Sequence, residues 1–157
     1  MADAAPRHHS RGKVMSESGD LKERLVALLE AERAGVAVAK KMLAESDSKQ
    51  ETELLLAVLG GEKDGCRQLG KVILDLGFTG SGNIGDFFGK VMALSSKTER
   101  LSLLIKGQEW VVRKLEEVLG SDLPARDRKF LEKVREDHVV NIEKCRKFLE
   151  RGIEHDG

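Results

Sequence analysis

Hydrophobic side chains recur every three or four residues along four long segments of the chain, which is the spacing of one face of an α-helix. These segments cover about residues 20–45, 48–76, 97–119 and 126–152. We expect each segment to form a helix whose apolar face packs against the other three in a shared core. The sequence therefore predicts an all-α protein.

A polar residue interrupts each apolar face near its middle, and the four are Glu32, Glu62, Gln108 and His138. Glu32 and Glu62 are 30 residues apart, and so are Gln108 and His138. A carboxylate or an imidazole in a core is costly unless it is paired, hydrogen-bonded or bound to a metal ion. The four residues therefore mark a candidate site inside the bundle.

The connections between the predicted helices indicate how the helices are arranged. The first and second helices, and the third and fourth, are joined by short turns, whereas the connection between the second and third is long. This connection is rich in glycine up to Gly85 and becomes periodic over Phe87–Leu94, which predicts a short helix. A long connection can carry the chain back along the bundle, so we expect a ferritin-like four-helix bundle with one crossover.

The polar N-terminus predicts a boundary ahead of the bundle. Residues 1–17 have the composition of a disordered tail, and the bundle is expected over residues 18–153. Asp20, with Glu23 three residues later, is a candidate N-cap for the first helix.

Composition excludes several classes of function. The 157 residues suit one domain, and the 27 basic and 27 acidic side chains give a formal net charge of zero, so we expect no nucleic-acid partner. No apolar run approaches the roughly 18 residues of a membrane span. The N-terminus lacks the apolar segment of a secretory signal, so we expect a cytoplasmic location. Cys66 and Cys145 fall on core faces and, in the crossover arrangement, lie too far apart for a disulfide.

The spacing of the polar residues points to a metal site. Di-iron bundles use a Glu from each of two helices and Glu-x-x-His from the other two. Glu32, Glu62 and His138 fit this pattern, but Gly65 replaces the second helix's His and Arg135 replaces the fourth helix's Glu. Three such ligands are enough for one iron, manganese or zinc ion.

Two other interpretations of the same residues stay open. In a metal-free network, Arg135 neutralises Glu32 or Glu62, Gln108 bridges neighbouring groups, and Asn141 hydrogen-bonds His138 or a backbone carbonyl. The polar layer then specifies how the helices align rather than any chemistry. In a third interpretation, the helices enclose a small-ligand pocket, whose candidate lining residues are Gly61, Gly65, Cys66 and Trp110.

Four segments resemble a small, uncharacterised family of bacterial ferritin-like domains, over about residues 21–149. They read LLEAERAG (28–35), GDFFGKVMAL (85–94), GQEWVVRKL (107–115) and HVVNIEKC (138–145). The resemblance implies a ferritin-like bundle, alone or attached to other domains, and no established activity. Gly65 stands where the relatives tend to carry an aromatic residue.

These observations favour a non-catalytic binding or structural protein that forms a homodimer through one face of the bundle. The alternative is a protein that binds one metal ion, with redox or metal-storage-related activity. The sequence does not decide whether the protein is an enzyme.

Overall fold

The described part of the chain, residues 4–156, contains five helices and no strand, which confirms the all-α prediction. We describe a computed structural model, in which side chains are described for residues 19–151. Within this part, no helix has the length and apolar character needed to cross a bilayer. The helices are α1 (Ala4–Ala44), α2 (Lys49–Asp75), α3 (Phe87–Met92), α4 (Lys97–Leu119) and α5 (Ala125–Asp156).

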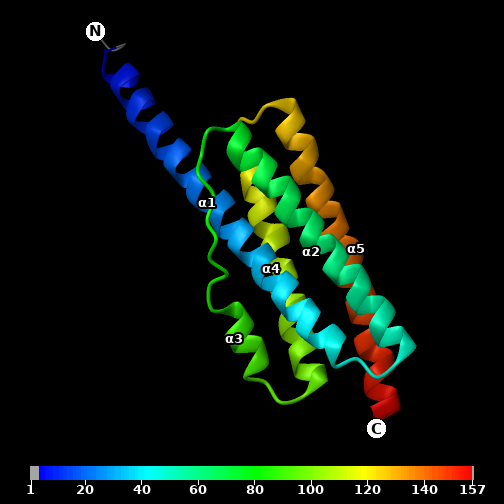
Figure 1. Cartoon of the computed structure of the whole chain (residues 1–157). Coiled ribbons are helices and arrows are strands. Elements are labelled where there is room, and N and C mark those ends of the chain that lie inside the picture. The colour runs from blue at the N-terminus through cyan, green and yellow to red at the C-terminus, as the bar shows by residue number, and fades with distance from the viewer. Residues whose placement is uncertain (1–3, 157) are drawn as a thin grey trace.

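The four long helices form two antiparallel hairpins joined by a long connection (Figure 1). Helix α1 packs against α2 and α4, and α5 packs against α4 and α2. The connection that follows α2 runs back along the bundle to α3, so α4 starts at the same end as α2 (Figure 1). Each long helix is therefore antiparallel to both of its packed neighbours, and α2 and α5 run in opposite directions. Cys66 and Cys145 are both free thiols.

Local chemistry fixes the ends of the central helices. The side chain of Ser48 caps α2 by accepting a hydrogen bond from the backbone N–H of Glu51 at 3.1 Å. At the other end Gly77, with φ of 79°, donates to the carbonyl of Leu74, and Phe78 donates to that of Ile73. This pattern is a Schellman motif, which favours glycine because its backbone is left-handed at that position.

The first helix begins earlier than the sequence predicts. It extends back to Ala4, so Asp20 lies inside a helix and is not its N-cap. Pro6 lies in the first turn, where proline is tolerated, and no later proline occurs in α1, so the backbone ladder can continue through Asp20. The predicted boundary at residue 18 therefore does not coincide with a helix end.

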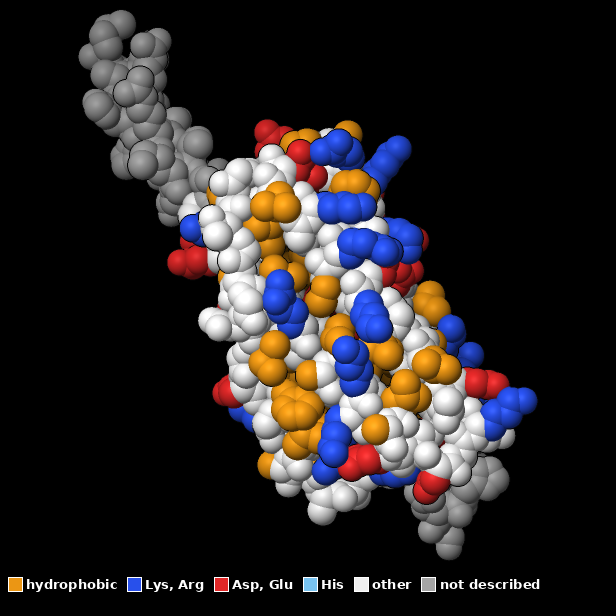
Figure 2. Space-filling model, viewed as in Figure 1, with side chains coloured by type: hydrophobic (Ala, Val, Ile, Leu, Met, Phe, Trp, Pro, Cys, Tyr) orange, Lys and Arg blue, Asp and Glu red, His pale blue; other side chains and the backbone are white. Residues whose placement is uncertain are grey.

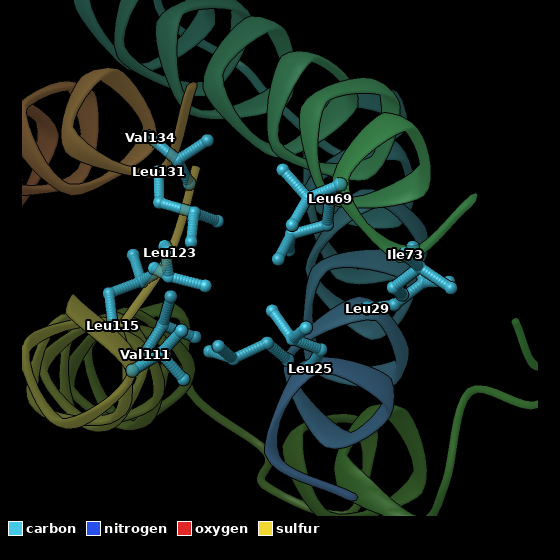
Figure 3. Close-up of a cluster of buried hydrophobic side chains, with 12 residues drawn as sticks. Leu25, Leu29, Leu69, Ile73, Val111, Leu115, Leu123, Leu131 and Val134 are labelled. Carbon is cyan, nitrogen blue, oxygen red and sulfur yellow. The ribbon is translucent and has the colours of Figure 1, made fainter. Parts of the chain in front are cut away.

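Two hydrophobic clusters fill the interior. In Figure 3 the side chains of the first cluster point from α1, α2, α4 and α5 into the space between the helices. This cluster includes Leu25, Leu69, Leu115 and Leu131, and the second includes Val38, Leu55, Leu104 and Cys145. Along each helix the two clusters are separated by the polar residue that interrupts its apolar face. A buried polar layer thus divides the core of the bundle.

The start of α4 provides a test of the helix ends. Ser96 accepts a hydrogen bond from the backbone N–H of Glu99 at 3.0 Å. We expect Ser96→Ala to lower the free energy of unfolding by about 1 kcal/mol, since this N–H loses its partner. Ser95 is exposed and precedes the cap, so Ser95→Ala should change stability by less than about 0.5 kcal/mol. Urea unfolding of both variants measures the difference in stability. Equal losses of stability in Ser96→Ala and Ser95→Ala would contradict the capping role of Ser96.

Candidate metal centre

One polar side chain from each long helix lies in the layer between the two clusters. Glu32, Glu62, Gln108 and His138 are all buried, with exposed fractions of 0%, 4%, 2% and 1%. Figure 2 accordingly shows no histidine on the face that it displays, where hydrophobic side chains alternate with Lys and Arg. Glu32, Glu62 and His138 each offer one ligand atom, and these three atoms lie within 4.8 Å of one another. The structure therefore brings together the three residues that the sequence singled out as metal ligands.

The backbone sets the orientation of the His138 ring. Its Nδ1 lies 2.9 Å from the carbonyl oxygen of Val134, one turn earlier in α5. Because a carbonyl can only accept, Nδ1 carries the proton in this contact, and a neutral imidazole then presents a lone pair at Nε2. A hydrogen bond of this kind is the usual means of fixing a metal-binding histidine.

The Nε2 atom of His138 faces both carboxylates. It lies 2.7 Å from Oε1 of Glu32 and 3.7 Å from Oε1 of Glu62. Despite the short distance, neither Nε2 nor the oxygens of Glu32 have a partner of hydrogen-bond geometry among the described residues. Ligands about 2.1 Å from a shared metal ion lie roughly 3 Å from one another. The contacts therefore suit ligands that converge on one ion.

Burial and proximity alter the proton affinities of the site. Burial, together with the nearby Glu62 carboxylate, raises the pKa of Glu32 to about 8, although His138 opposes this increase. Burial lowers the pKa of His138, but the Glu32 and Glu62 carboxylates outweigh this effect and hold it well above its ordinary value. Without a cation, the site therefore retains protons near neutral pH.

Two glycines provide the space for the carboxylates. A Cβ atom on Gly65 of α2 would overlap the carboxylate of Glu32 from α1. A Cβ atom on Gly35 of α1 would overlap the carboxylate of Glu62 from α2. Each carboxylate thus lies directly against the backbone of a glycine on the neighbouring helix. In both helices this glycine comes three residues after the helix's own glutamate. Any larger residue at either glycine would displace a carboxylate.

The predicted role of Arg135 is wrong. Its side chain is 40% exposed and lies 3.8 Å from Glu116 of α4, so it does not neutralise Glu32 or Glu62. The reason is its position on α5. A residue three places before His138 is turned by about 60° from the inward direction, toward α4 and the solvent. The metal-free network loses the cation on which it depended.

The other predicted network residues lie beside the site. Asn141 is 7% exposed and donates from Nδ2 to the carbonyl oxygen of Ala57 at 3.2 Å, one of its two predicted partners. Gln108 directs its Nε2 toward Sγ of Cys145 at 3.9 Å. Both side chains tie neighbouring helices together around the site.

Of the four residues predicted to line a small-ligand pocket, Gly61 lines a surface groove, whereas Gly65, Cys66 and Trp110 line neither of the two openings described below. The Glu32 carboxylate fills the space beside Gly65, and Trp110 packs at the edge of the first hydrophobic cluster. A cavity of about 500 Å³ lies where α1 and α2 meet α4 and α5, and a groove of about 380 Å³ lies between α2 and α5. Gly61 lines the groove.

Sequence reasoning missed Gly35. It treated Gly65 as the loss of a histidine ligand, whereas the structure uses both glycines as seats for carboxylates. A repeated Glu-x-x-Gly spacing in two adjacent antiparallel helices could have identified both glycines. It occurs as Glu32-Arg-Ala-Gly35 in α1 and as Glu62-Lys-Asp-Gly65 in α2.

The contact of Gly65 with the Glu32 carboxylate predicts that two similar glycine-to-alanine substitutions in α2 change stability in opposite directions. Gly65→Ala should destabilise the protein by about 1–3 kcal/mol, because its Cβ displaces the buried Glu32 carboxylate. Gly70→Ala meets nothing within 4 Å and should stabilise by up to about 1 kcal/mol, since alanine favours a helix. Urea unfolding of chelator-treated protein measures both changes in stability. A Gly65→Ala variant as stable as the wild type would contradict the close contact between Gly65 and the Glu32 carboxylate.

The raised pKa values of Glu32 and His138 predict how the chelated protein responds to pH. The folded state binds protons more tightly than the unfolded state, so this stability is present at low pH and is lost as pH rises through the folded pKa. We expect Tm to fall between about pH 6.5 and pH 9, and Glu32→Gln to flatten this decrease.

Asp127 provides a control, because it is a buried carboxylic acid outside the site whose pKa is also raised. Burial, with the neighbouring Asp75, raises the pKa of Asp127 to about 6, so Asp127 contributes at lower pH. Asp127→Asn should therefore leave the decrease above about pH 6.5 unchanged. A Tm that is constant or rises with pH over this range would contradict the assignment.

Comparison with known proteins gives a family but no activity. No curated protein and no solved structure matches the chain significantly. A family model described as a domain of unknown function (DUF6306) matches residues 20–147, a range that includes the candidate ligands Glu32, Glu62 and His138 and the two glycines, Gly35 and Gly65. The chain belongs to the DUF6306 family.

Proposed function

We propose that the protein is a ferritin-like bundle that binds one divalent transition-metal ion through Glu32, Glu62 and His138. The observation that carries this proposal is the convergence of three buried ligand atoms within 4.8 Å, with Nδ1 of His138 held by a backbone carbonyl. The two hairpins and the long returning connection support the ferritin-like assignment, since bundles of this arrangement build metal sites from inward-facing carboxylates and histidines.

Charge balance favours a divalent ion. Two carboxylates and one neutral imidazole carry a charge of −2, which a divalent cation neutralises inside an apolar core. Arg135 lies outside and cannot supply this charge. In the absence of a metal ion, the site must instead retain protons on Glu32 and His138, as the raised pKa values of both groups indicate.

The ligand types limit the choice of metal. Two carboxylates and one imidazole suit iron(II), manganese(II) and zinc(II), whereas the cysteines do not belong to the ligand group. Three protein ligands leave positions for water or another molecule, at which a bound ion would supply Lewis-acid chemistry or, for iron and manganese, electron exchange. The chain itself holds the ion, fixes the His138 tautomer and excludes bulk water.

The structure favours one ion rather than two. The histidine that a second ion would need in α2 is replaced by Gly65, whose side-chain space holds the Glu32 carboxylate. In α4 the neutral Gln108 faces Cys145, and Arg135 replaces the glutamate of α5. We therefore infer a stoichiometry of one ion per chain and a role in handling a metal for redox or storage-related purposes.

A structural role without metal is the competing function. The 2.7 Å separation of His138 and Glu32 also suits a purely electrostatic contact, which would fix the alignment of α1 and α5. The two functions differ in one measurable respect, namely whether the native protein binds a metal ion stoichiometrically.

Metal titration tests the proposal. Chelator-treated protein should bind one equivalent of iron(II), manganese(II) or zinc(II), as measured by calorimetry, and the bound ion should raise Tm by mass action. Glu32→Gln, which keeps the shape of the side chain, should weaken binding by at least tenfold, because a charged ligand becomes a neutral amide.

A matched variant controls for general effects of charge. Glu30 lies two residues earlier in α1 and outside the ligand group, so Glu30→Gln should bind metal as the wild type does. Equal losses in the two variants would overturn the assignment of Glu32. Failure of all three metals to bind folded wild-type protein would overturn the proposal and leave the structural role.

A further inference from the structure

Two exposed leucines lie on one line along the outer side of α2. Leu56 is 52% exposed and Leu74 is 74% exposed. They are eighteen residues apart, which is five full turns of an α-helix, so both side chains point in the same direction about 27 Å apart. Lys63 and Arg67 are exposed between them, each within about 20° of the same line. This line, the α2 ridge, is therefore apolar at its two ends and basic at its centre.

Helix α1 extends the basic face beside the ridge. Burial raises the pKa of the Cys66 thiol to about 11, the two site carboxylates add to the increase, and the nearby Arg33 guanidinium opposes it. Nε of Arg33 is buried and has no hydrogen-bond partner among the described residues. Lys40 follows seven residues later on the same side of α1 and is exposed. In Figure 2, Lys and Arg side chains lie among hydrophobic ones over α1 and α2, and the visible acidic side chains lie mostly toward the edges.

Four basic side chains on this face have no acidic partner. Arg33, Lys40 and Lys63 form no ion pair with a described residue. Lys71, on the α5 side of the ridge, lies over the ring of Phe130 at 5.5 Å and is likewise outside these ion pairs. The whole chain has a formal net charge of zero, so its charge is distributed unevenly over the surface.

The ion pairs along the α5 side of the ridge do not change this balance. Asp64 pairs with both Arg67 and Lys133, and Lys133 also pairs with Asp137. Two carboxylates and two cations therefore neutralise one another at this margin.

Two further acids lie at the margins of the face. Glu53, three residues before Leu56, is exposed and turned by about 60° toward α5. Glu30 of α1 is half-buried and turned by about 60° from Arg33, away from α2. Even with both acids counted, four unpaired cations leave the face positively charged.

An anionic surface that also accepts apolar side chains matches this face. A bilayer with anionic lipids offers both, because its headgroups attract basic side chains and its interface accepts leucine. Since Leu56 and Leu74 lie on the same side of one helix, both can reach a flat surface together. The phosphates of a nucleic acid would meet the basic centre and leave both leucines in water, and a second copy of the face would bring like charges together.

We propose that the face formed by α1 and the α2 ridge binds the surface of a membrane that contains anionic lipids. Arg33, Lys40, Lys63 and Lys71 contact the headgroups, and the two leucines enter the interface at the ends of the ridge. This binding does not depend on the metal ion, because the face points to solvent whereas the proposed ligands of the ion are buried between the helices.

Vesicle sedimentation of the full chain tests the charge requirement. The wild type should bind vesicles of phosphatidylcholine with about 30% phosphatidylserine but not vesicles of phosphatidylcholine alone, and salt should weaken the binding. Lys63→Gln should weaken it about fivefold, since one basic side chain near the surface is lost. Lys106 is exposed on α4, which packs against α1 and α5 in the described bundle and lies diagonal to α2. Lys106→Gln should therefore change binding by less than about twofold.

A substitution of Leu74 tests the apolar requirement. Leu74→Ser should weaken binding to the same anionic vesicles by at least about fivefold, because the leucine no longer enters the interface. Val139 is 48% exposed and lies one turn after Arg135, which pairs with Glu116 of α4. Val139→Ser therefore changes an exposed apolar side chain on another face and should leave vesicle binding unchanged. Circular dichroism should show that all variants retain helix.

Three results would overturn the proposal. The first is a wild type that does not bind the anionic vesicles at low salt. The second is an equal loss of binding in Lys63→Gln and Lys106→Gln, which would assign the binding to another surface. The third is unchanged vesicle binding in Leu74→Ser, which would make the face a site for a polyanion such as a nucleic acid or an acidic protein.

Discussion

The burial of two carboxylates beside one imidazole is the constraint on which the rest of the structure depends. Glu32, Glu62 and His138 lie in a core that is apolar above and below them, so their charge must be balanced within the layer itself. Two protons, held on Glu32 and His138, can balance it, and so can one divalent cation. This requirement explains why Glu32, Glu62 and His138 converge from three of the long helices.

The backbone provides what this layer needs. The carboxylates occupy space only because Gly35 and Gly65 lack side chains where α1 and α2 pack against each other. The carbonyl of Val134 orients the imidazole from within α5. Gln108 and Asn141 direct their polar groups toward Cys145 and Ala57, which links neighbouring helices without adding charge. The two glycines and the Val134 carbonyl together fix where the two carboxylates and the imidazole lie.

Hydrophobic periodicity predicts most of this architecture. It locates the helices that became α2, α4 and α5, the short helix in the long connection, and the four inward-facing polar residues, because burial of one helical face constrains each of them. It could not locate the start of α1, where polar composition suggested a tail although no proline interrupts the helix. The inward position of Arg135 was inferred from the Glu-x-x-His spacing and not from the periodicity, and it is wrong because a residue three places from His138 lies at the margin of the buried face, where packing decides its direction.

X-ray absorption spectroscopy of protein loaded with one equivalent of zinc(II) tests the central claim most directly. The account predicts a first coordination sphere of oxygen and nitrogen at about 2.0–2.2 Å, with the multiple-scattering signature of a single imidazole and no sulfur. This signature should disappear in His138→Gln. A sphere with sulfur, with several imidazoles or with water alone would place the ion elsewhere and contradict the account.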